Sequence, residues 1–462
     1  MRRLVVVGGD AAGMAAASQV RRRAGHGGRE PVEVVVLERG SFTSYSACGI
    51  PYWVAGEVDG PDALVSRTPE EHRANGIDVR MQTEAVSVDV ERRSVRTRAA
   101  DGTETDLGYD DLLLATGSVP TRPDVPGVRA PGVHGVQTLD DGQALLDALL
   151  AADRPVRRVA IVGGGYVGLE VAEACRRRDL EVSVVDRSPA PLASTFDPDV
   201  AEQVADAVRG LGIDLHLGSP VTGVELDADG HAAGVRTADL LVPADLVVLG
   251  LGVRPAVSLG AAAGVPLGSS GGYAVDRSMR TPVPGVWAAG DCVESVHRLS
   301  GQRAVVALGT HANKQGRVAG INLSGGYATF PGVVGTAVTR ICSLEVARTG
   351  LSEREAREAG FAWVTATVDT TTRAGYFPGT APIRVKVLAE RRTGLLLGAQ
   401  IVGREGAAKR IDVLAVAIWN RMTVDEVQSL DLSYAPPFAP VWDPVLVAAR
   451  RAFAAVEADA PD

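Results

Sequence analysis

The stretch LVVVGGDAAG, residues 4–13, joins four apolar residues to a turn that contains glycine. An alanine-rich run up to Arg23 predicts a helix after this turn, and the apolar run from Val32 to Leu37 predicts a second strand that ends at Glu38. Glycines in such a turn let the main chain approach a pyrophosphate at the helix N-terminus, and the acid can accept hydrogen bonds from ribose hydroxyls. The unit predicts a dinucleotide site, although Asp10 stands where the second glycine of the usual pattern belongs.

The same unit occurs a second time. The stretch VAIVGGGYVG, residues 159–168, precedes a predicted helix and the strand 182–185, which ends at Asp186. One glycine turn is weak evidence because such turns close many strand–helix units that bind nothing, but two complete copies indicate two dinucleotide sites. From about residue 331 the strand-like and helical segments carry no glycine turn, which predicts a separate α+β domain.

Length and composition limit the class of protein. A chain of 462 residues has room for about three domains, and 46% hydrophobic with 22% charged residues is typical of a globular protein. A net charge of −9, no run of 18 apolar residues and no leader-like N-terminus predict a cytoplasmic protein without a nucleic-acid or membrane partner. The four cysteines are too far apart for a metal motif or a disulfide framework, so no metal site is predicted.

Two further segments carry a family resemblance. LLLATGSVP, residues 112–120, and GVWAAGD, residues 285–291, resemble the ATG segment and the second FAD motif of the flavoprotein disulfide reductases with two dinucleotide-binding domains. The resemblance covers nearly the whole chain and implies an α/β fold with two Rossmann-like domains, for FAD and NAD(P)H, and a C-terminal α+β dimerisation domain. The implied domains are FAD-binding at 1–120 and 275–325, NAD(P)H-binding at 121–274, and dimerisation at 331–455.

The resemblance also implies the residues that hold FAD and NADH or NADPH. They are Gly8, Asp10, Ala11, Ala12, Gly13, Glu38, Arg39, Ala85, Thr116, Gly117, Asp291, Ala307, Gly163, Gly165, Tyr166, Val167, Glu170, Asp186 and Gly252. An acid at position 186 favours NADH, because it accepts from the ribose 2′-hydroxyl and repels a 2′-phosphate. Arg187 beside it leaves NADPH open.

The stretch SYSACGIPY, residues 44–52, resembles the single-cysteine branch of the family, which holds coenzyme A disulfide reductases, NADH oxidases and persulfide reductases. Enzymes of the glutathione and lipoamide type have a second cysteine and a C-terminal His-Glu pair, and both are missing here. Cys48 is then the redox thiol, with a pKa that a helix N-terminus beside the flavin is expected to lower. Unreactive packing is the alternative for any free cysteine, and it is retained for Cys175, Cys292 and Cys342.

The resemblance favours coenzyme A as the substrate carrier over oxygen. Oxygen- and peroxide-reducing members have a histidine in the first glycine loop, and residues 9–12 contain none. The contacts to coenzyme A that the resemblance implies are Gln19, Arg22, Ser44 and Asn313. A solvated helix face is the alternative for the first two. Ala47 and Trp442 depart from the coenzyme A pattern, in which an asparagine and a basic residue occur.

Two tail segments complete the implied site. YAPPF, residues 434–438, and AGYFPG, residues 374–379, resemble segments whose tyrosines reach across a homodimer to the thiol. Tyr376 and Tyr434 are therefore expected to donate hydrogen bonds or protons to a leaving thiolate, with half-buried packing as the alternative. Lys409 and Arg410 are expected to neutralise phosphate near the same interface.

The function predicted from these residues is a homodimeric FAD enzyme. It passes electrons from NADH or NADPH through Cys48 to a small-molecule disulfide, persulfide or polysulfide of coenzyme A, with coenzyme A held as a mixed disulfide on that thiol. One alternative is an NADH oxidase that reduces oxygen or peroxide. Another, from a different class, is a flavin-bearing redox sensor that binds NAD(H) and turns over slowly.

Overall fold

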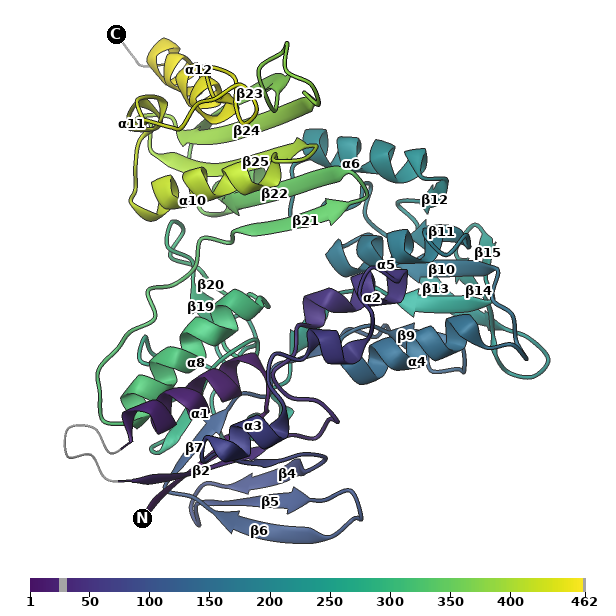
Figure 1. Ribbon diagram of the computed structural model, residues 1–462, viewed down its shortest axis with the longest axis vertical. Helices are drawn as coiled ribbons and strands as arrows, with labels where there is room; N and C mark the ends of the chain where they lie inside the picture. Colours follow the sequence, from purple (N-terminus) through teal and green to yellow (C-terminus); the bar gives the residue numbers. More distant parts are fainter. Residues whose placement is uncertain (25–30, 460–462) are drawn as a thin grey trace.

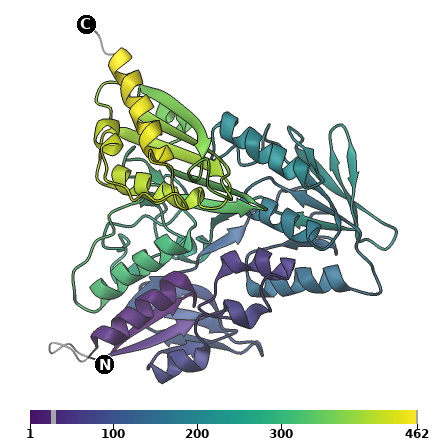
Figure 2. The same ribbon diagram turned by 45° about the horizontal axis from the view of Figure 1, so that its top comes forward.

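The computed structural model describes residues 1–24 and 31–459, which form three lobes (Figure 1). The first lobe contains the N-terminal strands, the second contains the middle of the chain, and the third contains the C-terminal sheet and helices. A turned view separates the same lobes and places the C-terminal helix at the end away from the N-terminus (Figure 2). Among the described residues, no helix is both long and apolar enough to span a lipid bilayer.

A parallel sheet in the order β18-β7-β1-β2-β3 forms the first lobe. Its strands are β1 (Arg2–Val7), β2 (Val32–Leu37), β3 (Asp78–Arg80), β7 (Asp111–Leu114) and β18 (Val286–Ala288). The central strand is buried from Leu4 to Val7, as its continuous apolar sequence predicts for a strand that is covered on both faces.

Two helices pack tightly on this sheet. Helix α1 (Ala11–Arg23) follows the first glycine turn, and α8 (Gly309–Leu323) comes from a distant part of the chain and lies beside it (Figure 1). A Cβ on Gly316 of α8 would lie 2.1 Å from the main-chain oxygen of Ala12, so only glycine permits this approach. The first lobe is therefore completed by residues that follow the second lobe in sequence.

The second lobe repeats the first. Its parallel sheet has the order β12-β11-β10-β16-β9, so the strand before the glycine turn is again central. Its elements are β9 (Val133–Gly135), α4 (Leu139–Leu150), β10 (Arg158–Val162), α5 (Tyr166–Arg176), β11 (Glu181–Val185), α6 (Pro198–Gly210), β12 (Ile213–His216) and β16 (Leu246–Leu249). The predicted duplication is confirmed.

Shorter elements connect and decorate these two lobes. The connecting helices are α2 (Ile50–Ala55), α3 (Pro69–Ala74) and α7 (Ser258–Ala262), and a 3₁₀ turn, η1 (Ala47–Gly49), precedes α2. The small antiparallel sheets are β4 (Glu84–Asp89) with β5 (Ser94–Arg98) and β6 (Glu104–Gly108), β13 (Val221–Leu226) with β14 (Ala232–Thr237) and β15 (Leu241–Pro243), β8 (Ser118–Pro120) with β17 (Val253–Pro255), and β19 (Ser295–Val296) with β20 (Arg303–Ala304).

The third lobe is the predicted α+β unit. Its antiparallel sheet has the order β21-β22-β25-β24-β23, built from β21 (Ala337–Ile341), β22 (Leu344–Gly350), β23 (Trp363–Thr371), β24 (Pro382–Glu390) and β25 (Leu396–Gly403). Its helices are α9 (Glu353–Glu358), α10 (Ile411–Trp419), α11 (Val424–Gln428) and α12 (Pro444–Ala458). The first strand of this lobe starts at Ala337, after Gly335 turns the chain with a φ of +70°. The fold class is confirmed: two Rossmann-type units are followed by an α+β unit.

Candidate active site

The first glycine turn has the geometry of a nucleotide cradle. Gly8 has a φ of +107°, and a Cβ there would lie 2.1 Å from the main-chain oxygen of Ala115. A Cβ on Gly13 would lie 1.9 Å from the main-chain oxygen of Gly8, so both positions require glycine. The Glu38 carboxylate accepts from the amide of Gly9 at 2.7 Å, which places the acid against the turn. This arrangement fits the adenosine end of FAD.

Asp10 ties this turn to the segment that carries the thiol. It stands at the N-cap of α1 without capping the helix, and its Oδ1 accepts from the amide of Tyr45 at 3.3 Å. The main-chain oxygen of Gly9 accepts from the amide of Ser44 at 3.3 Å and also from the Thr43 hydroxyl. Burial raises the pKa of Asp10 to about 6, and the nearby charges of Glu38 and Asp291 add to this.

The second FAD motif meets the same end of α1. Gly290 has a φ of +92°, and a Cβ there would lie 2.9 Å from the Cβ of Ala12. The next residue, Asp291, accepts from the Ser118 hydroxyl at 3.1 Å, and burial raises its pKa. Asp291 and the first glycine turn are thus brought together, as the resemblance implies, although they lie far apart in sequence.

The second glycine turn has the same construction as the first. Gly163 has a φ of +109°, and a Cβ on Gly168 would lie 2.0 Å from the main-chain oxygen of Gly163. The Asp186 carboxylate accepts from the amide of Gly164 and, at 2.6 Å, from the amide of Ser188. Arg187 is exposed and makes no hydrogen bond or ion pair with the residues that the structure describes.

The remaining cofactor candidates lie around these two turns. Ala11 begins α1, and Gly165 stands at the N-terminus of α5, where the Tyr166 hydroxyl is buried and Val167 is exposed. Gly117 and Gly252 adopt positive φ, and the Thr116 hydroxyl donates to the main-chain oxygen of Ala256 at 2.6 Å. Arg39 is exposed after β2, Ala85 lies on β4, and Ala307 lies just before α8. The described contacts do not bring these last three to the thiol.

Cys48 lies in η1 and is open to solvent. The surrounding protein raises the pKa of this thiol, and the charges of Glu170 and Asp291 raise it further. The expectation of a lowered pKa is therefore wrong for this chain: burial outweighs any effect of α2, which has only six residues, and two acids from different lobes add to the rise. The effect of these acids indicates that the thiol lies near both the FAD motif and α5, the helix of the second glycine turn, against which α2 packs.

The segment behind the thiol is held by the other lobes. Arg178 donates to the main-chain oxygen of Val54 at the end of α2. Arg340 of β21 pairs with Glu57 at 3.0 Å and stacks over the Tyr52 ring at 5.5 Å. Helix α2 is therefore fixed by residues from the second and third lobes.

The other cysteines have packing positions. Cys175 and Cys292 are fully buried, and burial raises their pKa values to about 12 and about 11. Cys342 is partly buried in the turn between β21 and β22, where its amide donates to Glu173 at 2.7 Å. Of the four cysteines, Cys48 is thus the one that is exposed to solvent.

Tyr376 and Tyr434 lie together on the surface of the third lobe. Their exposed fractions are 78% and 48%. The surrounding protein raises the pKa of Tyr434, and Tyr376 is close enough to raise it further. The amide of Ala374 donates to the main-chain oxygen of Pro436 at 3.3 Å, which joins the two tyrosine segments. The β23–β24 hairpin lies at the top of the molecule and α2 near its middle (Figure 1), so a single chain does not bring these phenols to Cys48.

The two basic residues expected at phosphate have different surroundings. The Arg410 guanidinium donates to the main-chain oxygens of Thr372 and Phe438, both at 2.7 Å, and its Nε donates to Asp443 at 3.2 Å. These contacts occupy it with the protein and clamp the two tyrosine segments together. Lys409 is exposed and pairs with Asp412. The phosphate contacts expected of both residues stay predictions.

The expected coenzyme A contacts are placed on three elements. Arg22 donates to Gln19 at 3.0 Å on α1, and Asn313 donates to the main-chain oxygen of Gly309 at 2.9 Å on the neighbouring α8. Ser44 has a φ of +51°, and its hydroxyl lies 2.9 Å from Nε2 of His72. No sequence motif singles out His72, because its partner lies 28 residues earlier in the chain.

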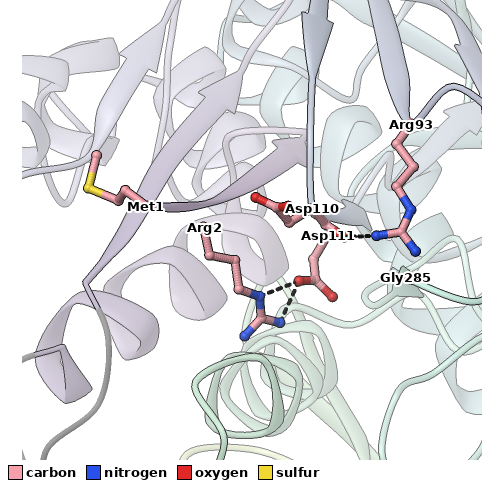
Figure 3. Close-up of a pocket in the computed structure, with 6 residues that line it drawn as sticks. All are labelled: Met1, Arg2, Arg93, Asp110, Asp111 and Gly285. Atoms are coloured by element: carbon pink, nitrogen blue, oxygen red, sulfur yellow. Dashed lines mark hydrogen bonds and ion pairs between the residues drawn. The ribbon is translucent and has the colours of Figure 1, made fainter.

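A polar depression elsewhere has no part in this site. It lies where β1 begins and is lined by Met1, Arg2, Arg93, Asp110, Asp111 and Gly285 (Figure 3). Arg2 pairs with Asp111, and Arg93 donates to the main-chain oxygen of Asp110 at 3.4 Å. The first glycine turn lies at the opposite end of β1, and none of the candidate residues lines the depression.

Fold and site together define an oxidoreductase that binds two dinucleotides and carries one open thiol. The chain belongs to the pyridine nucleotide-disulphide oxidoreductase family: the family model matches residues 2–326, and the model of its dimerisation domain matches residues 336–444. Members of this family bind FAD and NAD(P)H, and the glycine turns, Glu38, Asp186 and Asp291 described above fit these groups.

Relatives with different names resemble the chain over nearly its whole length. It is 37% identical to the NAD(P)H sulfur oxidoreductase (CoA-dependent) of Pyrococcus furiosus, over 97% of this chain and 98% of the relative. It is 34% identical to an NADH oxidase of Methanocaldococcus jannaschii, again over 97% of this chain and 98% of the relative. The solved structure of an NAD-dependent persulfide reductase from A. fulgidus superposes with a TM-score of 0.94 at 34% identity, covering 99% of this chain and 84% of that one.

Proposed function

We propose that this protein is a homodimeric NAD(P)H:disulfide oxidoreductase that reduces a disulfide, persulfide or polysulfide of coenzyme A through Cys48. The observation that carries the proposal is the position of this thiol, which is open to solvent and near enough to Glu170 of the second glycine unit and Asp291 of the FAD motif for both charges to act on it. The family relationship and the name of the Pyrococcus furiosus relative support the same substrate class.

The raised pKa of Cys48 suits a thiol that rests as a mixed disulfide with coenzyme A. Bound FAD supplies the transfer of an electron pair from NAD(P)H to the thiol site. Two electrons break the sulfur–sulfur bond and leave Cys48 directly as a thiolate, so no base has to remove a proton, and the released coenzyme A takes up a proton. The thiolate then attacks a new coenzyme A disulfide, which restores the mixed disulfide and releases a second coenzyme A thiolate. A thiolate of high pKa is also the stronger nucleophile.

The separation of the tyrosines from the thiol supports a dimer. Tyr376 and Tyr434 are exposed neighbours on the third lobe, which matches the dimerisation domain of the family. In the proposed dimer, the phenols of one chain donate protons to the thiolate that leaves the Cys48 site of the other. The proposed division into FAD-binding residues 1–120 and 275–325, NAD(P)H-binding residues 121–274 and dimerisation residues 331–455 follows the same lobes.

The contacts of Asp186 support a preference for NADH. Its carboxylate is held by the amides of Gly164 and Ser188, which keeps a negative charge where the ribose of the nucleotide binds. A 2′-phosphate at this position meets that charge, and NADPH is therefore the poorer donor.

The test compares the isolated protein with Cys48→Ser, using Cys342→Ser as the matched control. We expect a coenzyme A adduct on Cys48 by mass spectrometry, its loss on addition of NADH, and disulfide turnover that Cys48→Ser abolishes and Cys342→Ser retains. Turnover of coenzyme A disulfide by Cys48→Ser contradicts the proposal. Faster reduction of oxygen than of any disulfide indicates an oxidase, in line with the Methanocaldococcus jannaschii name, and slow turnover with every acceptor indicates a sensor.

A further inference from the structure

A buried histidine lies behind the thiol segment without belonging to any of the motifs above. His72 sits in α3 (Pro69–Ala74), where only 2% of its surface is exposed, and its Nε2 lies 2.9 Å from the hydroxyl of Ser44. The helix is fixed by a capping box, in which the Glu71 amide donates to Thr68 and the Thr68 amide donates to the Glu71 side chain at 2.8 Å. The ring is therefore anchored on a short but well-capped support.

The main chain of Ser44 is held on both sides. Its amide donates to the main-chain oxygen of Gly9 at 3.3 Å, and its own oxygen accepts from the amide of Ser66 at 2.8 Å. The φ of +51° is uncommon for a residue with a Cβ and occurs where the surrounding structure imposes it. The main chain fixes the backbone of Ser44 but not the rotation of its side chain. The hydrogen bond to His72 fixes the hydroxyl.

The segment from Ser44 leads to the thiol through further pairing. The amide of Ser46 donates to the main-chain oxygen of Leu64 at 2.9 Å, and the 3₁₀ turn with Cys48 follows immediately. Ser44 is half-buried, whereas His72, its hydrogen-bond partner, is buried. Burial, followed by the charge of Arg67, lowers the pKa of His72, so the ring is neutral and has one N–H and one lone pair.

We propose that His72 is a positioning residue of the thiol site, which acts through Ser44 to present a fixed hydroxyl to the disulfide substrate. In one tautomer the histidine accepts the hydroxyl proton, and in the other it donates to a hydroxyl lone pair. Either way, the remaining donor or acceptor of the hydroxyl is directed toward the substrate. The inference rests on the proposed function, because it assigns a role in binding the disulfide that Cys48 attacks.

The experiment is a double-mutant cycle on the FAD-loaded enzyme, with Ser44→Ala, His72→Phe and both together. His72→Phe keeps the volume and removes the hydrogen bond, whereas His72→Gln retains a polar nitrogen near the position of Nε2. We expect each single variant to raise the KM for coenzyme A disulfide about fivefold, the cost of one ordinary hydrogen bond, and the double variant to raise it no further. The KM for NADH stays unchanged, and His72→Gln restores most of the loss.

The possible outcomes separate this inference from the proposed function. If the wild-type enzyme fails to reduce coenzyme A disulfide, the proposed function fails and the inference fails with it. If the wild type reduces it but Ser44→Ala leaves its KM unchanged, or the two single effects add, only the inference is overturned. A lower melting temperature for His72→Phe without a change in KM shows that the ring serves packing alone and overturns it as well.

Discussion

The ammonium group of Lys386 lies 3.1 Å from the carboxylate of Asp197, and both side chains are almost completely buried. Lys386 belongs to β24 in the third lobe, and Asp197 stands just before α6 in the second. Asp199 at 2.7 Å and Glu353 at 2.9 Å complete the group. Burial acts to lower the pKa of Lys386, but the three carboxylates outweigh it and raise the pKa. The buried ammonium group of Lys386 thus joins the two lobes, and it is the cation in all three of these ion pairs.

Lys386→Met is expected to destabilise the protein by about 3 kcal/mol or more, because it leaves the buried carboxylate of Asp197 without its cation. The measurement is thermal unfolding at pH 7, with Lys409→Met as the control, since that lysine is exposed and pairs with a single acid. The raised pKa adds a pH dependence: the stabilisation by Lys386 is present at neutral pH and is lost as the pH rises through its folded pKa, above 10.5. A variant that unfolds like the control contradicts the role of this charge.

Asp10→Asn is expected to stabilise the protein at neutral and alkaline pH. The pKa of this carboxyl is raised from 3.8 to about 6, so its ionised form costs stability above pH 6 and the cost disappears below pH 4. The gain at pH 8 is up to about 3 kcal/mol, because asparagine removes the charge and still accepts from the Tyr45 amide. Unfolding measured from pH 4 to 8 checks this, and a difference that does not shrink toward pH 4 argues against it.

Alkylation of Cys48 by iodoacetamide, after reduction with dithiothreitol, is expected to follow the raised pKa of the thiol. The rate rises with pH through a midpoint above 9.0, since only the thiolate reacts. Glu170→Gln removes the larger of the two charges that raise this pKa and therefore lowers the midpoint. Glu173→Gln, one helical turn further along α5, is the matched control. A midpoint near neutral pH in the wild type refutes the assignment.

Arg410→Met is expected to lower the rate of disulfide turnover at least tenfold, because it releases the segments of Tyr376 and Tyr434 from each other. Flavin reduction by NADH in a stopped-flow measurement stays unchanged. A disulfide without phosphate groups must suffer the same loss as coenzyme A disulfide. A loss restricted to the phosphate-bearing substrate shows instead that Arg410 binds phosphate.

Asp186→Ala is expected to lower the KM for NADPH about tenfold and to raise that for NADH. Arg187 has no partner among the described residues, so its guanidinium is available to a 2′-phosphate once the acid is gone. Arg187→Ala in the same background removes the gain. Titration of the enzyme with NADP⁺ measures the same change without turnover, and an unaltered affinity means that other residues set the preference.

The sequence predicts what is local and fails where distant groups act together. The two strand–turn–helix units were predictable because Gly8 and Gly163 occupy backbone positions where a Cβ collides with a neighbouring carbonyl. The sign of the Cys48 pKa shift was not, because it depends first on burial by the surrounding protein and then on the charges of Glu170 and Asp291, and only the tertiary fold brings these groups together. His72 was missed for the same reason, and so were the contacts of Arg410 with the main-chain oxygens of Thr372 and Phe438.

The glycine contact between α1 and α8 has a consequence for how the chain is made. The first lobe starts at residue 2, but β18 and α8, which close it, come only after the whole second lobe. During synthesis, the ribosome must release residues up to Leu323 before Gly316 can settle against Ala12. The second lobe is continuous in sequence and is therefore expected to fold first. Until translation has passed α8, one side of the apolar N-terminal strands stays uncovered, and we expect chaperones to protect it.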